Sequence, residues 1–368
     1  MNEARPLRIL IIKTHAIGDL LMTTPAIRDI RGAHPQAHIT LLVGKWSSPA
    51  IRWNPHIDER IEVEDTVFLG RRNWRGLFAL LFKVRRLRFD KAFVFHPLPA
   101  VHLFARLAGI PERYGLVAAR GSRHLTAAVQ EKLGPDDYYP DNFLRVAALD
   151  GVKTGAATLE VHTAAADEDA AEQALRAAGL EPGADYVLVA PGGGRNSKED
   201  VAAKRWPTEH FIAVIRDLQR RRPGLPVILT GAGSDRVETG AVVAAMPHVI
   251  DLTGKTSLRA LFSLTRRARA VLCNDTALLH VAVACGTPVV AAFGPTSRAR
   301  FLPPARREDA VQSTLACSPC YVGGHFPGCT IGYQCMREIG PEVLGAKLES
   351  VLNRPRGVYG DADVPGAS

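Results

Sequence analysis

The chain has 368 residues, of which 46% are hydrophobic and 23% charged, as in a soluble globular protein of about two domains. This composition excludes fibrous and largely disordered classes, no apolar run is long enough to cross a bilayer, and the N-terminus lacks a secretory signal, so we expect a cytoplasmic protein. The formal net charge of +9 favours anionic partners such as nucleotides, phosphorylated glycolipids, acidic membranes or nucleic acids.

The first half of the chain alternates short apolar runs with helical patterns. A buried strand is predicted at Leu7–Lys13, then a turn at His15–Asp19 and a helix at Leu20–Ala33, whose first turn Pro25 interrupts or resets. The other elements predicted here are strands at His38–Val43, Ile61–Val63 and Lys91–His96 and helices at Asn73–Arg86 and Val101–Ala108. Strands that alternate with helices predict a parallel sheet covered on both faces.

The composition changes at Thr163–Gly183, which is rich in alanine and acidic residues and is predicted to contain a helix and the crossing between domains. A second α/β series follows. Its strands are predicted at Tyr186–Ala190, Val227–Thr230, His248–Leu252 and Arg269–Cys273, and its helices at Glu209–Arg221, Asp235–Ala245 and Ser257–Arg267. Both halves therefore read as doubly wound α/β domains, which bind ligands at the carboxyl ends of their strands.

The segment Arg269–Ser297 is the most informative part of the second half. It reads as a strand, an Asn-Asp-Thr turn, a short apolar helix, a stop at Gly286 and a second buried strand. The free N–H groups at such a helix start attract phosphates, and Asp275 and His280 add polar groups beside them. An ordinary βαβ unit in which Asp275 only caps the helix fits the segment equally well.

Three loops carry candidate chemistry. In the loop 13–19, Gly18 permits a close approach and Asp19 at the helix entrance is a candidate proton acceptor, although it also fits a helix cap. In the loop after residue 190, glycines and Lys204 suit a phosphate, without the Gly-Lys-Ser/Thr triplet of a P-loop. The loop 231–235 is a weaker candidate for a ribose or base edge.

Residues 71–91 are strongly basic. The cations are Arg71, Arg72, Arg75, Lys83, Arg85, Arg86, Arg88 and Lys91, against the single acid Asp90. A solvated helix face explains such a run, and so does a docking surface for an anionic acceptor or for membrane headgroups. Large apolar residues are interleaved with the charges as in an amphipathic helix, which favours the docking surface.

Four cysteines lie within a short stretch near the C-terminus. These are Cys317, Cys320, Cys329 and Cys335, whereas Cys273 and Cys285 lie alone in apolar surroundings. Four close thiols in a cytoplasmic protein favour a tetrahedral thiolate site for structural zinc or iron over a set of reduced or disulfide-bonded cysteines.

Taken together, these segments resemble glycosyltransferase family 9, the ADP-heptose:lipopolysaccharide heptosyltransferases. The matching stretches are RILIIKTHAIGDLLMTTPAIRDIR, PGGGRNSKEDVAAKRWPTEHF, LTGAGSDR, CNDTALLHVAVACGTPVVAAFGPTS and CSPC with CM. The resemblance implies the GT-B fold, two Rossmann-like domains with the active site in the cleft between them. We assign residues 1–170 to an acceptor-binding domain, 171–340 to a nucleotide-sugar-binding domain, 341–353 to a helix that crosses back, and 354–368 to a flexible tail.

The resemblance also implies an inverting transfer from an ADP-sugar to a hydroxyl of the lipopolysaccharide core without a catalytic metal. The family's catalytic aspartate corresponds to Asp19, which would deprotonate the acceptor hydroxyl. The donor-binding positions correspond to Gly193, Gly194, Lys204, Asp235, Asp275, Thr276, Ala277 and His280. Arg71, Arg72 and Arg75 are our candidate acceptor-binding residues.

Other functions stay open at this stage. Some relatives that glycosylate autotransporter proteins carry a four-cysteine iron-binding finger, so a protein O-heptosyltransferase is an alternative. A non-catalytic nucleotide-sugar-binding subunit has little reason to retain Asp19, Lys204 and Asp275 together. A nucleic-acid-binding protein is disfavoured because the chain contains no motif of that class. Peripheral contact with the inner membrane is compatible with the basic segment.

Overall fold

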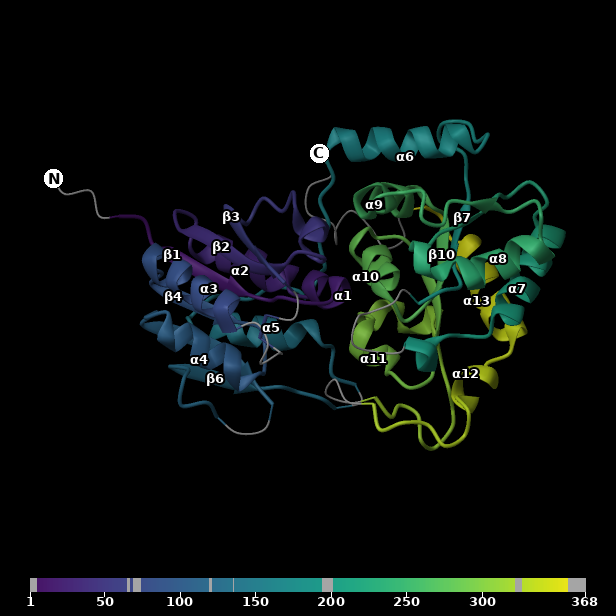
Figure 1. Cartoon of the computed structure of the whole chain (residues 1–368). Coiled ribbons are helices and arrows are strands. Elements are labelled where there is room, and N and C mark those ends of the chain that lie inside the picture. The colour runs from purple at the N-terminus through teal and green to yellow at the C-terminus, as the bar shows by residue number, and fades with distance from the viewer. Residues whose placement is uncertain are drawn as a thin grey trace. The chain divides into compact units, whose positions relative to one another are not determined.

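The computed structural model describes residues 5–64, 67–68, 74–118, 121–134, 136–193, 201–321 and 326–356. The chain divides into two compact units, the first ending at His162 and the second beginning at Thr163. Each unit contains a six-stranded parallel sheet with helices on both faces (Figure 1). This is the doubly wound α/β fold that the sequence predicts, present twice.

The first sheet has the strand order β3-β2-β1-β4-β5-β6. Its strands are β1 (Arg8–Ile12), β2 (His38–Gly44), β3 (Glu59–Val63), β4 (Lys91–Val94), β5 (Glu112–Val117) and β6 (Ala127–Gln130). The chain first adds strands on one side of β1 and then, from β4, on the other side. The loops after β1 and β4 therefore diverge at this point, which is where doubly wound sheets bind ligands.

The helices of the first unit differ from the prediction where one expected helix is divided in two and where α5 was not anticipated. They are α1 (Ile17–Leu21), α2 (Thr24–Ala33), α3 (Trp74–Leu87), α4 (Pro99–Leu107) and α5 (Pro140–Ala148), with a 3₁₀ turn η1 (Ser48–Ile51). The single helix expected up to Ala33 is two helices, because Pro25 has no N–H to donate and occupies the first turn of a new helix. The hydroxyls of Thr23 and Thr24 donate to the carbonyls of Leu20 and Leu21 at the break.

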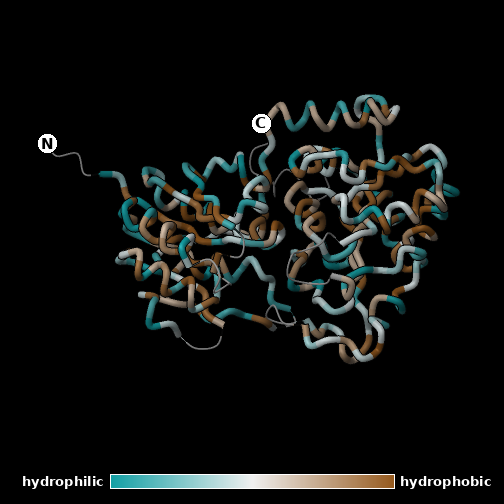
Figure 2. The backbone as a smooth tube through the Cα atoms, viewed as in Figure 1, coloured by the Kyte–Doolittle hydropathy of each residue, from teal (hydrophilic) through white to brown (hydrophobic). Residues whose placement is uncertain are grey.

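Alternate side chains of the strands bury opposite faces of the first sheet. Leu10 and Ile12 pack with Leu80 and Val84 of α3 and with Phe104 of α4. Figure 2 shows the hydrophobic residues concentrated along the strands. None of the described helices is long and apolar enough to span a membrane.

The second sheet repeats the strand order of the first, as β12-β11-β10-β7-β8-β9. Its strands are β7 (Val187–Ala190), β8 (Val227–Leu229), β9 (Ile250–Asp251), β10 (Ala270–Asn274), β11 (Val289–Phe293) and β12 (Val311–Gln312). Here the loops after β7 and β10 diverge. The segment identified above as strand, turn and helix thus ends at the ligand-binding edge of this sheet.

The second unit contains the remaining helices. They are α6 (Ala165–Ala177), α7 (Thr208–Arg221), α8 (Arg236–Ala245), α9 (Leu258–Arg267), α10 (Ala277–Ala284), α11 (Arg298–Phe301), α12 (Gln334–Arg337) and α13 (Pro341–Leu352), with 3₁₀ turns η3 (Val201–Lys204), η4 (Gly233–Asp235) and η5 (Pro304–Asp309). Gly286 has φ 72°, the left-handed stop predicted for the end of α10.

Helix α13 is the element for which we expected a crossing to the N-terminal domain. Its buried side chains Leu344, Leu348, Val351 and Leu352 belong to the core of the second unit, together with strands β7, β8, β10 and β11. In the same core the indole Nε1 of Trp206 donates to the Ile339 carbonyl, at 2.8 Å, just before this helix begins.

The last residues of the first unit form a hydrogen bond and an ion pair with helix α2. The Glu160 amide donates to Thr24 Oγ1 at 2.9 Å, and Arg28 Nη1 lies 2.9 Å from Glu160 Oε1. Burial raises the pKa of Glu160, but hydrogen bonds from His162 and His56 and the charge of Arg28 outweigh it and lower this pKa to about 2. The buried carboxylate is therefore ionised at neutral pH.

Candidate active site

In the first unit, Asp19 lies just beyond the carboxyl end of β1. Its Oδ2 is 3.0 Å from Lys13 Nζ, and the Lys13 side chain is 3% exposed whereas that of Asp19 is 34% exposed. The N-cap of α1 is Ala16, so Asp19 does not occupy the capping position that we considered as its alternative role. A partly exposed carboxylate of this kind is accessible to a ligand and can accept a proton from a hydroxyl group.

The loop that leads to Asp19 is fixed by a side chain that follows the neighbouring strand, β4. His96, which follows β4, places Nε2 3.0 Å from the Thr14 amide and 3.2 Å from Thr14 Oγ1. The His96 ring also lies 4.8 Å from that of His15. Ala16 adopts φ 61°, a conformation that L-residues rarely take, so these contacts hold the loop in an otherwise unfavourable shape.

In the second unit, hydrogen bonds from a side chain at the end of β10 likewise fix the loop after β7. The buried Asn274 Nδ2 donates to the carbonyls of Pro191 and Gly192 at 2.9 and 3.0 Å. Its Oδ1 accepts a hydrogen bond from the Trp206 amide at 2.9 Å. One amide side chain thus holds three backbone groups of the candidate site in place.

We therefore expect Asn274→Ala to lower the free energy of unfolding by about 3 kcal/mol, because it leaves buried Trp206 N–H and carbonyl groups without this partner. Urea unfolding followed by fluorescence measures the change. Asn353→Ala, at the exposed end of α13, is the matched control and should change stability by less than about 0.5 kcal/mol. Equal stability losses in the two variants would contradict this role of Asn274.

The Lys204 ammonium is the centre of the candidate donor site. It lies 3.0 Å from Asp275 Oδ2, and the lysine side chain is 19% exposed whereas that of Asp275 is 4% exposed. The rings of Tyr321 and Phe301 lie 5.0 and 5.8 Å from the same ammonium. This leaves a cation held by one carboxylate and two aromatic faces, with part of its surface accessible to a ligand.

The start of α10 adjoins this cation. Its N-cap is Thr276 rather than Asp275, and the Thr276 side chain forms no capping hydrogen bond. Thr276 and Ala277 are half-buried, while His280 is buried with its ring 5.7 Å from that of Phe301. The structure thus brings together four of the predicted donor-binding residues, namely Lys204, Asp275, Thr276 and Ala277, with His280 one helical turn further on.

Asp235 has a structural role in its loop. It is buried, and its Oδ2 accepts a hydrogen bond from the Ala232 amide at 2.8 Å. Its side chain occupies the space that a Cβ at Gly192 would need, with atoms at 2.5 Å. These contacts explain the glycine there, and the contact of Asp235 with a ribose stays a prediction. Gly193 is half-buried, whereas Gly194 lies outside the described residues.

Of the predicted acceptor-binding arginines, Arg71 and Arg72 lie outside the described residues. Arg75 is exposed on α3, with its guanidinium 5.2 Å from the centre of the Trp74 ring. The structure therefore places one of the three on the amphipathic helix that the sequence predicts, and their contact with an acceptor stays a prediction.

The four-cysteine metal site is not supported. Within the described residues, which include all four cysteines, their sulfurs do not form a group of ligand atoms within 4.8 Å of one another, and all are free thiols. Cys317 and Cys329 are exposed, whereas Cys335 is packed in the core beside Gly294. Burial, and to a smaller extent the other three cysteines, raise the pKa of Cys335 to about 11. The four cysteines are close in sequence, but their sulfur atoms do not point to a common centre.

Several residues that shape the site were not assigned a role from the sequence. They are Lys13, His96, Asn274, Phe301 and Tyr321. His96 and Asn274 share one signal, since each is a polar residue at the end of a predicted strand that lies beside the first strand of its sheet. Phe301 ends the short helix α11 and Tyr321 lies in a loop, and the sequence pattern determines the position of neither.

Comparison with known proteins identifies the family. The sequence model of glycosyltransferase family 9 (heptosyltransferase) matches residues 77–327, a range that includes Lys204 and Asp275 and begins after Asp19. Lipopolysaccharide heptosyltransferase 2 of Salmonella typhimurium is 26% identical over 313 residues, which cover 81% of this chain and 85% of that protein.

Solved structures agree in fold. A family 9 glycosyltransferase from Veillonella parvula has a TM-score of 0.77 at 23% identity and covers 94% of this chain and 97% of its own. The E. coli ADP-heptose LPS heptosyltransferase II has a TM-score of 0.72 at 21% identity, with coverage of 94% and 98%. Both support the GT-B class of two Rossmann-like domains. The chain therefore belongs to glycosyltransferase family 9 and is a glycosyltransferase.

Proposed function

We propose that this glycosyltransferase moves a heptose from ADP-heptose to a hydroxyl of a lipopolysaccharide core, with inversion at the anomeric carbon. Two of the relatives named above support the sugar and the acceptor, because they are lipopolysaccharide heptosyltransferases and one of them is named for its ADP-heptose donor. The observation that carries the proposal is the Lys204–Asp275 pair at the N-terminus of α10, at the ligand-binding edge of the second sheet.

In this proposal the second unit binds the ADP part of the donor. The diphosphate gains negative charge as the glycosidic bond breaks, and the Lys204 ammonium offers it a positive charge. The first N–H groups of α10, at Thr276 and Ala277, have no partner within the helix and add hydrogen bonds to the same oxygens. Interactions that strengthen as charge develops lower the barrier to bond cleavage.

The first unit activates the acceptor. The Asp19 carboxylate takes the proton of the acceptor hydroxyl while its oxygen forms the new bond to the anomeric carbon and the ADP leaves from the opposite side. Lys13 compensates the charge of Asp19 before the transfer, and the contacts of His96 with Thr14 keep the loop in position. A single displacement of this kind inverts the anomeric configuration.

The direct test is a transfer assay with the full chain, ADP-heptose and a lipopolysaccharide core that lacks heptose. Mass spectrometry should show the acceptor gaining one heptose, and NMR of the product should show an anomeric configuration opposite to that of the donor. ADP-glucose and UDP-glucose serve as control donors. If the enzyme transferred heptose only to a protein, the proposed lipopolysaccharide acceptor would be wrong. Retention of the anomeric configuration would exclude the single displacement.

We further propose that the exposed face of α3 contacts the membrane that holds the acceptor. Trp74, Phe78 and Phe82 follow one another at helical spacing and are 57%, 65% and 62% exposed. The guanidinium of Arg86 lies 5.5 Å from the centre of the Phe82 ring, so cations accompany the aromatic rings as in helices that lie in a membrane interface.

Binding to vesicles checks this second proposal. The full chain should sediment with vesicles that contain anionic phospholipid, and a Phe78→Ser/Phe82→Ser variant should bind at least about tenfold more weakly because it loses the apolar contact. A Leu103→Ser/Leu107→Ser variant removes apolar side chains of α4 that are 39% and 49% exposed and is the matched control. Equal binding by all three proteins would exclude α3 as the contact.

A further inference from the structure

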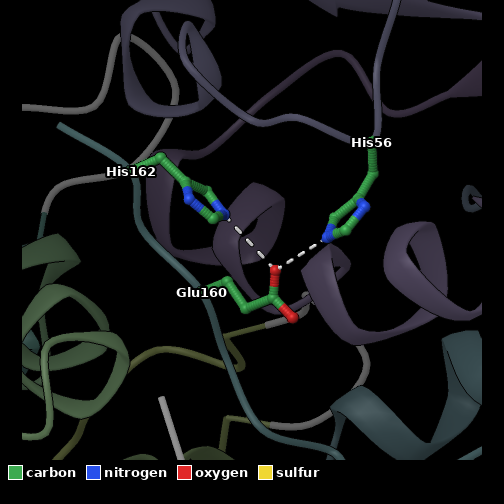
Figure 3. A group of neighbouring side chains, drawn as sticks. All are labelled: His56, Glu160 and His162. Carbon is green, nitrogen blue, oxygen red and sulfur yellow. Dashed lines mark hydrogen bonds and ion pairs between the residues drawn. The ribbon is translucent and has the colours of Figure 1, made fainter. Parts of the chain in front are cut away.

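Three potential metal ligands meet near the end of the first unit, apart from the proposed catalytic residues. His56 follows η1, and Glu160 and His162 lie in the segment that leads to Thr163, where the second unit begins. His56 Nε2 is 3.3 Å and His162 Nε2 is 3.4 Å from Glu160 Oε2, and all three ligand atoms lie within 4.8 Å of one another. Figure 3 shows both imidazole rings turned toward the same carboxylate oxygen.

These distances fit a tetrahedral metal ion. Two ligand atoms that each lie about 2.0–2.1 Å from zinc are about 3.3–3.4 Å apart at the tetrahedral angle. The two imidazole rings are inclined by 82° with centroids 6.3 Å apart, so their Nε2 atoms converge while the rings stay clear of each other. Small shifts of the side chains, without a change of the backbone, would therefore form three bonds to one ion.

The surroundings complete the arrangement. The Glu160 side chain is 1% exposed, and Arg28 holds its other oxygen, Oε1, at 2.9 Å. A ligating carboxylate is commonly oriented in this way by a second hydrogen-bonding group. The two histidines are each 21% exposed, which leaves solvent access for the ion and for a water molecule as a fourth ligand.

We propose that His56 Nε2, Glu160 Oε2 and His162 Nε2 form a binding site for a divalent transition-metal ion of the zinc type. The ion joins the segment before Thr163 to the loop that precedes β3, two parts of the first unit that are distant in sequence. Its role is structural, because binding by the folded protein stabilises the attachment of this segment. The site is independent of the cysteines and of the proposed donor and acceptor groups.

The test uses the full chain, freed of any affinity tag and of metal, with its exposed thiols alkylated. Titration with Zn²⁺ against a chromophoric chelator should show one ion bound per chain. His56→Gln and His162→Gln should each weaken binding at least about tenfold. His34→Gln is the matched control, since His34 also contacts a carboxylate in this unit, Asp150 at 2.8 Å, and should leave the affinity unchanged.

Co²⁺ gives a readout that does not depend on the variants. Bound at this site it should produce the visible absorption of a four-coordinate ion without the near-ultraviolet band of a thiolate ligand. Unchanged Zn²⁺ affinity in both histidine variants would overturn the proposal. If those variants fail to fold, the absence of tetrahedral Co²⁺ absorption in the unmutated, alkylated protein overturns it, and its presence supports it.

Discussion

Asp19→Ala is expected to reduce heptosyl transfer by about 10²–10⁴-fold, the usual contribution of a general base, while ADP affinity stays within about twofold of its original value. The reason is that the proposal assigns acceptor activation and ADP binding to different units. Asp19 belongs to the first unit and acts on the acceptor hydroxyl, whereas the groups proposed to bind ADP belong to the second unit. Steady-state kinetics with the transfer assay and calorimetry with ADP measure the two quantities.

Two further variants sharpen this experiment. Asp19→Asn keeps the shape of the side chain but cannot accept the proton as a carboxylate does, so it should lose activity to a similar extent. Glu64→Ala removes an exposed carboxylate of the same unit that pairs with Lys45, at 2.6 Å, and should leave both quantities unchanged. Transfer by Asp19→Ala at the original rate would show that another group is the base.

Lys204→Ala is expected to weaken ADP binding by about 10- to 100-fold, since a hydrogen bond to a charged group contributes about 1.5–3 kcal/mol. Asp275→Ala should also weaken it, because the lysine then loses the carboxylate that holds it at 3.0 Å. Calorimetry with ADP measures both affinities. Since the two residues act as one unit, the double variant should lose less than the sum of the two single losses.

Arg205→Ala is the matched control for this cycle. Arg205 follows Lys204 in the chain and forms its own ion pair with Glu238, at 3.0 Å. Its removal should leave ADP affinity within about twofold of the original value. If Lys204→Ala and Arg205→Ala behaved alike, the ammonium of Lys204 would not be the diphosphate ligand.

Much of the fold could be predicted from local patterns. The buried strands and the helices with strong apolar periodicity stand within a few residues of their predicted places, and α13 (Pro341–Leu352) coincides with the segment singled out near the C-terminus. The strands β5 and β6 were not anticipated. Side chains alternate between half-buried and exposed along β6, at the edge of its sheet, so its sequence lacks the continuous apolar run of a central strand.

The candidate site was predicted in part, for an identifiable physical reason. Asp275 directly follows β10, and Asp19 lies in the first helix after β1. The carboxyl ends of parallel strands define the ligand-binding edge, so position along the chain makes both residues candidates. The partners that fix these residues come from elsewhere. Phe301 ends the short helix α11 and Tyr321 lies in a loop, and no local periodicity specifies their contacts with Lys204.

The prediction of a metal site at the cysteines is not supported, for a different reason. Their spacing was taken to imply convergence, but α12 (Gln334–Arg337) places Cys335 in the core beside Met336 while the preceding loop leaves Cys329 at the surface. By contrast, His56, Glu160 and His162 lie close together in space although roughly a hundred residues separate His56 from the other two. No motif spacing predicts such a group.

The two sheets fasten their ligand-binding loops separately, through His96 in the first unit and Asn274 in the second. The positions of the proposed catalytic and donor-binding residues are therefore each fixed by contacts within their own unit. If the two units act as proposed, substitutions around Lys204 would alter the choice of sugar nucleotide while Asp19 stays in place. Substitutions in the first unit would alter the choice of acceptor without disturbing Asp275. Donor and acceptor preferences are then free to diverge in separate evolutionary steps.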